Sequence, residues 1–130
     1  MRVLVIEEGA EAALVCAALA RRPEVRVLES ADVPAALRQA RRQRPVLAIA
    51  GRRALADSVG DLVKGLGGKG VPVVGVAAGL PPAARRRALA AGVREIHARP
   101  AGWPAYAKLI DSLVGRFTRT GSAPRRARTR

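Results

Sequence analysis

The sequence predicts an α/β protein with an open, doubly wound parallel sheet that carries helices on both of its faces. Three observations predict this class. The apolar runs are short and rich in β-branched residues, they recur at even intervals, and longer segments rich in Ala, Leu and Arg separate them. Strands that alternate with helices through short connections produce this pattern. Five such units are too few for a closed eightfold barrel.

The predicted strands are the apolar runs themselves. They consist mainly of Val, Ile, Leu and Ala, and a Pro or Gly interrupts the chain near several of their ends. They cover Arg2 to Ile6, Val25 to Leu28, Val46 to Ala50, Val71 to Ala77 and Arg94 to Ala98. A strand that helices cover on both faces is expected to be continuously apolar, as the third of these is.

The predicted helices are the segments with apolar residues at helical spacing. They cover about Ala10 to Arg21, a segment capped by Ser30 or Asp32 that ends near Arg42, Ala54 to Leu66, Pro81-Pro82 to about Ala91, and Trp103-Pro104 to Phe117. Ser and Asp are favourable N-caps, and proline is favourable in a first helical turn. The third helix is expected to be continuous because its apolar residues share one face.

Length and composition fit one domain and a basic tail. A chain of 130 residues with a hydrophobic fraction of 49% can build a single core, which we expect to cover residues 1–117. Residues 118–130 contain five arginines and no acidic side chain, which predicts a disordered tail. No apolar run reaches the length of a membrane span, and we expect a cytoplasmic protein.

The basic charge is the second strong signal, since 24 basic and 10 acidic side chains give a formal net charge of +14. Arginine suits bidentate contacts to phosphate, so nonspecific nucleic-acid binding is one hypothesis; the alternative is that the charge only keeps the protein soluble. The densest cationic groups are Arg38, Arg41, Arg42 and Arg44, then Arg85, Arg86 and Arg87, and in the tail Arg125, Arg126, Arg128 and Arg130. Three aromatic side chains offer no stacking platform for sequence-specific recognition.

The residues directly after the strands form the candidate site, because ligands of open α/β sheets bind outside the carboxyl ends of the strands. These positions hold Glu7 and Glu8, Gly51, Ala77 and Ala78, and Arg99 and Pro100. They contain no pair of nucleophile and base and no cluster of metal ligands, so we do not predict an enzyme.

Taken in chain order, the strands and the residues that follow them resemble the response-regulator receiver family, over about residues 2 to 117. The resemblance is carried by Val3 to Glu8, Arg44 to Gly51, Val71 to Val74 and Ala91 to Pro100. It implies a five-stranded parallel sheet in the order 2-1-3-4-5, a flavodoxin-like three-layer sandwich. It also implies an acidic pair for magnesium, a phosphorylated Asp, a Ser or Thr, an aromatic residue, and a Lys before a cis proline bond.

Carried over position by position, only the acids and one cation of this pattern persist. Glu7 and Glu8 fit the acidic pair, Gly51 falls at the Asp, Ala77 at the Ser or Thr, Ile96 at the aromatic residue and Arg99 at the Lys. The resemblance therefore implies a receiver that lacks its phosphoacceptor and needs no cofactor, with weak or absent magnesium binding. We expect Arg99 to bridge Glu7 or Glu8, the alternative being a solvated acidic pair.

Two functional hypotheses follow. The first is a signalling module of a two-component-type pathway that cannot be phosphorylated and binds a protein partner. The partner surface would comprise the helix that ends near Ala91, the strand that ends at Ala98 and the helix that begins near Trp103, and a homodimer through this surface stays open. The second hypothesis is a small nonspecific nucleic-acid-binding protein that uses its arginines and its tail.

Overall fold

The computed structural model describes residues 1–67 and 70–122 and contains one five-stranded sheet in the order β2-β1-β3-β4-β5. All four neighbouring pairs are parallel. The strands are β1 (Arg2–Ile6), β2 (Arg26–Ser30), β3 (Leu47–Ala50), β4 (Val73–Ala77) and β5 (Glu95–Ala98). The predicted fold class and strand order are confirmed.

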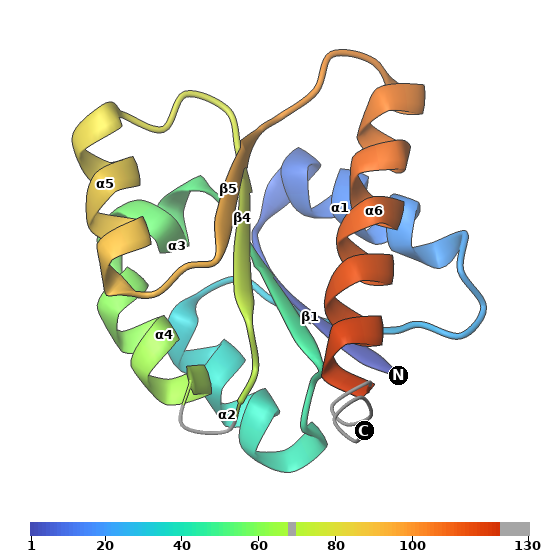
Figure 1. The fold of residues 1–130 in the computed structure, drawn as a ribbon, viewed down its shortest axis with the longest axis horizontal. Helices are drawn as coiled ribbons and strands as arrows, with labels where there is room; N and C mark the ends of the chain where they lie inside the picture. Colours follow the sequence, from blue (N-terminus) through green and yellow to red (C-terminus); the bar gives the residue numbers. More distant parts are fainter. Residues whose placement is uncertain (68–69, 123–130) are drawn as a thin grey trace, which may run out of the picture.

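Six helices within the described residues cover the two faces of the sheet. They are α1 (Gly9–Ala20), α2 (Val33–Gln43), α3 (Arg52–Asp57), α4 (Val59–Gly67), α5 (Pro82–Ala91) and α6 (Trp103–Ser122). α1 and α6 lie against one face, and α2, α3, α4 and α5 lie against the other (Figure 1). None of these helices combines the length and the apolar character needed to cross a membrane.

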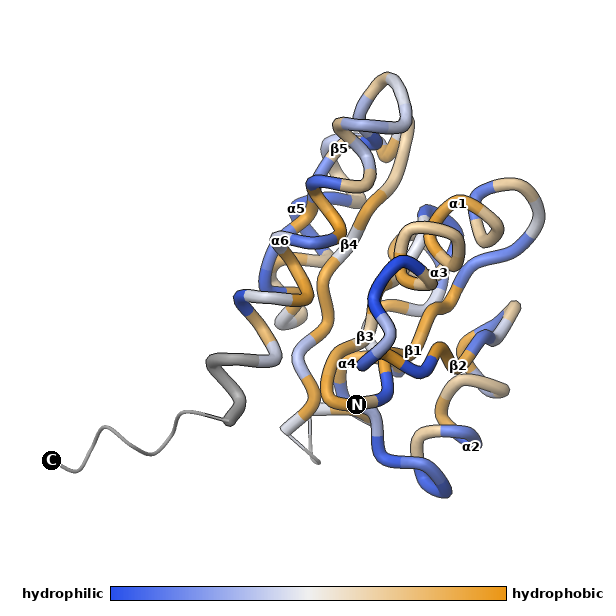
Figure 2. The backbone as a smooth tube through the Cα atoms, turned by 90° about the vertical axis from the view of Figure 1, so that its right-hand side faces the viewer, coloured by the Kyte–Doolittle hydropathy of each residue, from blue (hydrophilic) through white to orange (hydrophobic). Residues whose placement is uncertain are grey.

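Alternation along the central strands divides the core into two layers. In β1, Val3 and Val5 pack with α1 and α6, whereas Leu4 and Ile6 pack with the helices of the opposite face. β1 after Arg2, β3 and β4 are buried along their length, and Figure 2 shows these strands as mainly hydrophobic. Burial on both faces therefore explains why the strands could be recognised as continuous apolar runs.

The helix expected from Ala54 to Leu66 is two helices that meet at Ser58. The backbone of Ser58 leaves the helical region, with φ −141° and ψ 26°. Its N–H still donates to the carbonyl of Ala54, and its carbonyl accepts from Leu62, so Ser58 ends α3 and starts α4. Serine, β-branched valine and glycine at positions 58–60 have low helix propensity, which explains the break that the apolar face concealed.

The structure also defines the start of α2 and the end of α6. Asp32 is the N-cap of α2, since its Oδ1 accepts from the N–H of Ala35 at 2.8 Å, and Ser30 lies buried in β2. α6 continues to Ser122, beyond the helix end expected at Phe117. The rest of the predicted tail lies outside the described residues.

Candidate functional site

A polar cleft opens at the carboxyl ends of β1, β3 and β4, where the sequence placed the candidate site. Its volume is about 440 Å³, and it is lined by Glu7, Glu8, Glu11, Arg52, Arg53, Ala77 and Ala78. The parallel strands bring these residues together because all their carboxyl ends lie at one edge of the sheet. The walls of this cleft thus bring together Glu7, Glu8 and Ala77.

The carboxylate of Glu7 occupies the space beside Gly51. Gly51 is buried, follows β3 directly and forms the N-cap of α3, with its N–H donating to the carbonyl of Ile6 at 3.0 Å. A Cβ atom built on Gly51 would lie 1.6 Å from Oε2 of Glu7. No side chain at position 51 can coexist with Glu7 in this position, so the two residues fit each other.

Partial burial and backbone amides shift the pKa of Glu7 in opposite directions. Its Oε1 accepts from the N–H of Glu8 at 3.1 Å, and the backbone of Arg52 also donates to the carboxylate. Desolvation raises the pKa of Glu7 above its ordinary value, and it outweighs these hydrogen bonds, which lower it. Glu7 thus provides an acceptor at the start of α3, where Gly51 has no side chain to act as a cap.

The remaining acids of the cleft are held by arginines, in pairs that differ from the expectation. Arg53 Nη1 lies 2.5 Å from Oε2 of Glu8, and Arg99 pairs with Glu11. The predicted bridge from Arg99 to Glu7 or Glu8 is therefore wrong. Arg99 follows β5 at the edge of the sheet, where the first turn of α1 presents Glu11 to it.

Glu11 is the functional-site residue that the sequence reasoning missed. The positions directly after the strands did not include it, because it follows the end of β1 by several residues. The usable signal was its place in the first turn of α1, since that turn starts at the same edge as the cleft. Acidic residues are also favourable there because they lie at the positive end of the helix dipole.

The donor set does not fit a magnesium ion. Magnesium prefers near-octahedral oxygen ligands, usually carboxylates together with water or phosphate. Glu8 and Glu11 are paired with arginines, and Gly51 and Ala77 have no side-chain oxygen. Among the described residues, no cluster of three or more His, Cys, Asp or Glu side chains is arranged to hold a metal ion.

Two of the residues carried over from the resemblance, Ile96 and Arg99, lie in β5 and directly after it. Ile96 is buried in β5 and belongs to the core layer beneath α3 and α5 rather than to the cleft wall. The peptide between Arg99 and Pro100 is trans, which corrects the expectation of a cis bond.

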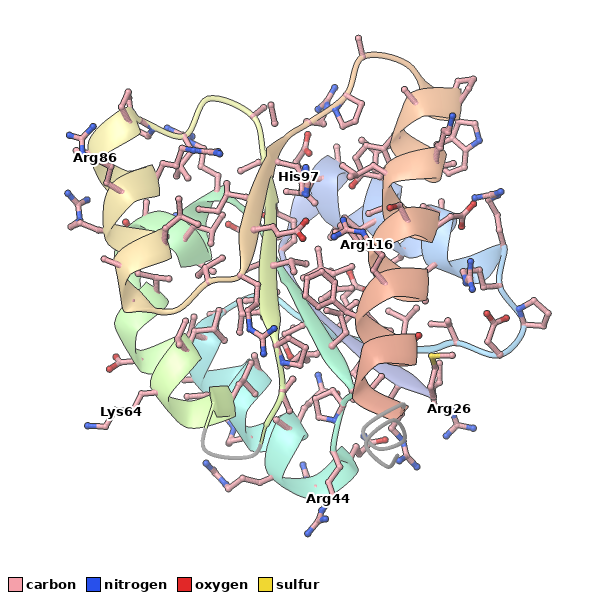
Figure 3. All side chains as sticks on the ribbon, in the orientation of Figure 1. Arg26, Arg44, Lys64, Arg86, His97 and Arg116 are labelled. Atoms are coloured by element: carbon pink, nitrogen blue, oxygen red, sulfur yellow. The ribbon has the colours of Figure 1, made fainter. Side chains whose placement is uncertain are left out.

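Three of the predicted anion-binding arginines, Arg85, Arg86 and Arg87, lie together on α5 within the described residues. Arg85 donates from Nη1 to the carbonyl of Ile96 at 3.0 Å, while Arg86 and Arg87 are exposed on α5. Figure 3 shows that Arg44, from the cationic group at the end of α2, lies well away from Arg86. The tail arginines, Arg125, Arg126, Arg128 and Arg130, lie outside the described residues.

The predicted partner surface around α5, β5 and α6 exposes large apolar side chains. Trp103 is 42% exposed and Leu89 is 40% exposed. The ring of Trp103 stacks on that of Tyr106, with centroids 6.4 Å apart and an interplanar angle of 15°. Tyr106 is buried, and its hydroxyl has no hydrogen-bond partner among the described residues.

An ionic cluster joins β5 to α6 on this surface. Arg116 donates to both carboxylate oxygens of Glu95, at 2.5 Å and 3.0 Å, and His97 Nε2 lies 2.7 Å from Oε1 of Glu95. The bonds from Arg116 lower the pKa of Glu95 to about 2. His97 and Arg116 thus contact the same carboxylate of Glu95.

Several solved structures with similar folds are receiver domains of response regulators. The signal receiver domain of NarL from Mycobacterium tuberculosis aligns with a TM-score of 0.70 and 20% identity, over 88% of this chain and 95% of that one. The response regulator domain of CheB from Thermotoga maritima has a TM-score of 0.68 and 16% identity, with 92% and 94% covered. The phosphorylated cyanobacterial phytochrome response regulator RcpA has a TM-score of 0.74 and 18% identity, with 92% and 94% covered.

No protein-family model matches the chain, and no curated protein sequence is similar to it. The structural matches nevertheless extend over nearly the whole of the receiver domains. The chain therefore has the receiver-domain fold.

Proposed function

We propose that the protein is a receiver-fold signalling module of a two-component-type pathway that binds a protein partner and does not accept a phosphoryl group after β3. The observation that carries this proposal is the pairing of Gly51 with Glu7. Gly51 has no nucleophile, and the carboxylate of Glu7 fills the space that an acceptor side chain would need. A cytoplasmic location accords with this function.

The surroundings of Gly51 support the same proposal. Phosphoryl transfer depends on positioning and on cations that neutralise the charge that develops on the transferred group. Arg53, which lines this cleft, is already paired with Glu8, and Glu11 of the cleft is paired with Arg99. Incoming phosphate would have to compete with these carboxylates, and Glu7 would repel it.

The surface of α5, β5 and α6 is the proposed site of partner binding or of homodimer formation. On this surface Trp103 is exposed on α6, and Leu89, Arg86 and Arg87 are exposed on α5. Aromatic and arginine side chains are enriched among the residues that dominate binding energy. The similar structures favour signalling over nucleic-acid binding, since they are receiver domains.

Treatment with acetyl phosphate and magnesium, followed by intact-mass spectrometry, tests the proposal. We expect the mass to remain unchanged under conditions in which RcpA, treated in parallel as the positive control, gains one phosphoryl group. A stoichiometric phosphoryl adduct on this chain would overturn the proposal, and peptide mapping would then locate the acceptor.

A further inference from the structure

A groove lies between α2 and α4, on the sheet face opposite α1 and α6 (Figure 1). Its volume is about 370 Å³, and it is lined by Val33, Pro34, Leu37, Ser58, Asp61, Lys64 and Gly65. A Cβ atom on Gly65 would lie 2.6 Å from a methyl carbon of Leu37, so the lack of a side chain there lets the helices approach. The α2 wall of the groove is aliphatic.

The rim of this groove carries cations without acidic partners. Arg38 follows Pro34 by four residues and Arg41 follows Leu37 by four, so both lie on the groove side of α2. Both are exposed, and α2 itself contains no acidic residue. Within residues 1–67 and 70–122, neither arginine has a carboxylate within ion-pair distance.

The opposite wall adds one more cation and one acid. Lys64 lies exposed on α4, and Figure 3 shows it pointing away from the molecule. It too has no carboxylate within ion-pair distance among the described residues. Asp61 is the acidic side chain of the lining. Three cations and one acid therefore surround an aliphatic floor.

We propose that this groove binds an acidic amphipathic helix of a partner protein. Such a helix places aliphatic side chains at positions i, i+3, i+4 and i+7, and these would fill the space over Val33, Pro34 and Leu37. Its flanking Glu or Asp side chains would face Arg38, Arg41 and Lys64, which gives complementary charge across the interface. These cations would repel a basic helix.

The same features make a nucleic acid a poorer occupant. Nucleic acids without sequence preference are bound by cationic grooves with aromatic side chains on which bases stack. No aromatic side chain lines this groove as described, and its floor is aliphatic. The inference rests on the proposed function only in that the chain acts by binding protein, and its test does not involve Gly51.

The test measures binding of a designed peptide to the full chain by fluorescence anisotropy. The probe is a fluorescein-labelled peptide of about 18 residues, long enough for helix formation, with Leu and Ala on one face and Glu on the rest. A peptide of the same composition in shuffled order, and a labelled DNA oligonucleotide, are the comparison probes. Two-dimensional ¹⁵N–¹H NMR of the titrated protein then locates the contact.

The discriminating variant is Arg38→Glu/Arg41→Glu, and the matched control is Arg2→Glu/Arg26→Glu, on β1 and β2, which belongs neither to the groove nor to the α5, β5 and α6 surface. Both variants change the net charge by the same amount and replace exposed arginines, so circular dichroism should show both folded. We expect the first to weaken binding of the amphipathic peptide about tenfold and the second less than about twofold. The amide signals of α2 and α4 should shift most.

Several outcomes would overturn the inference. They are an amphipathic peptide that does not bind at millimolar concentration, a shuffled peptide that binds equally well, or equal losses in the two variants. Tighter binding of the oligonucleotide through Arg38 and Arg41 would assign the groove to nucleic acid instead. If only the amide signals of α5, β5 and α6 shift, the acidic helix binds the surface formed by those elements and not the groove.

Discussion

The substitution Gly51→Asp tests the geometry of the cleft most directly. The backbone at position 51, with φ −91° and ψ −173°, accepts any L-residue, so the cost arises from Glu7 and not from backbone strain. The Cβ atom would lie 1.6 Å from Glu7 Oε2, and restoring an ordinary contact of about 3.5 Å requires a shift of roughly 2 Å. That shift breaks the hydrogen bond from Glu8 N–H, which contributes about 1 kcal/mol.

Charge repulsion adds to this steric cost. Two carboxylates about 4 Å apart repel by about 4 kcal/mol at an effective dielectric constant of about 20, and water in the open cleft reduces this value. We therefore expect Gly51→Asp to lower the free energy of unfolding by about 2 to 4 kcal/mol, at the high end for single substitutions. Gly51→Asn has a similar shape without the charge and should cost about 1 to 2 kcal/mol.

Urea denaturation followed by circular dichroism measures both effects, and a double-mutant cycle with Glu7→Ala isolates the contact. In the Glu7→Ala background, Gly51→Asp should be less destabilising by at least about 1 kcal/mol. At a pH low enough to protonate both carboxyls, Asp and Asn should become equivalent. The reasoning is refuted if Gly51→Asp costs the same in both backgrounds, because Glu7 would then not occupy the space beside residue 51.

Two further predictions concern α6. The lowered pKa of Glu95 means that its stabilising contribution is present above the ordinary value of 4.5 and is lost as pH falls toward about 2. The unfolding free energy of Glu95→Gln should therefore lie below that of the wild type by up to about 1 kcal/mol at neutral pH and approach it at pH 2; a constant gap would contradict this. Tyr106→Phe removes a buried hydroxyl without a partner, so its melting temperature should equal or exceed that of the wild type. A loss above about 1 kcal/mol would show that the hydroxyl is bonded.

The site could be located from the sequence, whereas its internal pairing could not. Glu7, Glu8 and Ala77 were placed at strand ends by counting along apolar runs, and the parallel sheet brings them to one cleft. Arg99 was expected beside Glu7 or Glu8 because all three follow strands. It pairs with Glu11 instead, because the first turn of α1 lies nearer to the end of β5. Which partner an arginine reaches depends on distances between elements, and residue order does not contain them.

The break at Ser58 is a similar case on the scale of one helix. The apolar residues on both sides of it share a face, which predicted a continuous helix from Ala54 to Leu66. Local propensity at positions 58–60 was the opposing signal, and packing decided between the two. The result is a groove between α2 and α4 that a pattern of apolar residues does not reveal.

The sequence by itself determined the class of the fold, the order in which strands and helical segments alternate along the chain, and the lack of a nucleophile at Gly51. These properties depend on local periodicity and on residue identity, and both can be read directly from the order of residues. Only the tertiary structure decided that Glu7 occupies the space beside Gly51, that Arg53 and Arg99 hold the other two acids, and that the Tyr106 hydroxyl is buried without a partner. These depend on ångström-scale distances between residues remote in sequence, and packing of the whole domain sets such distances.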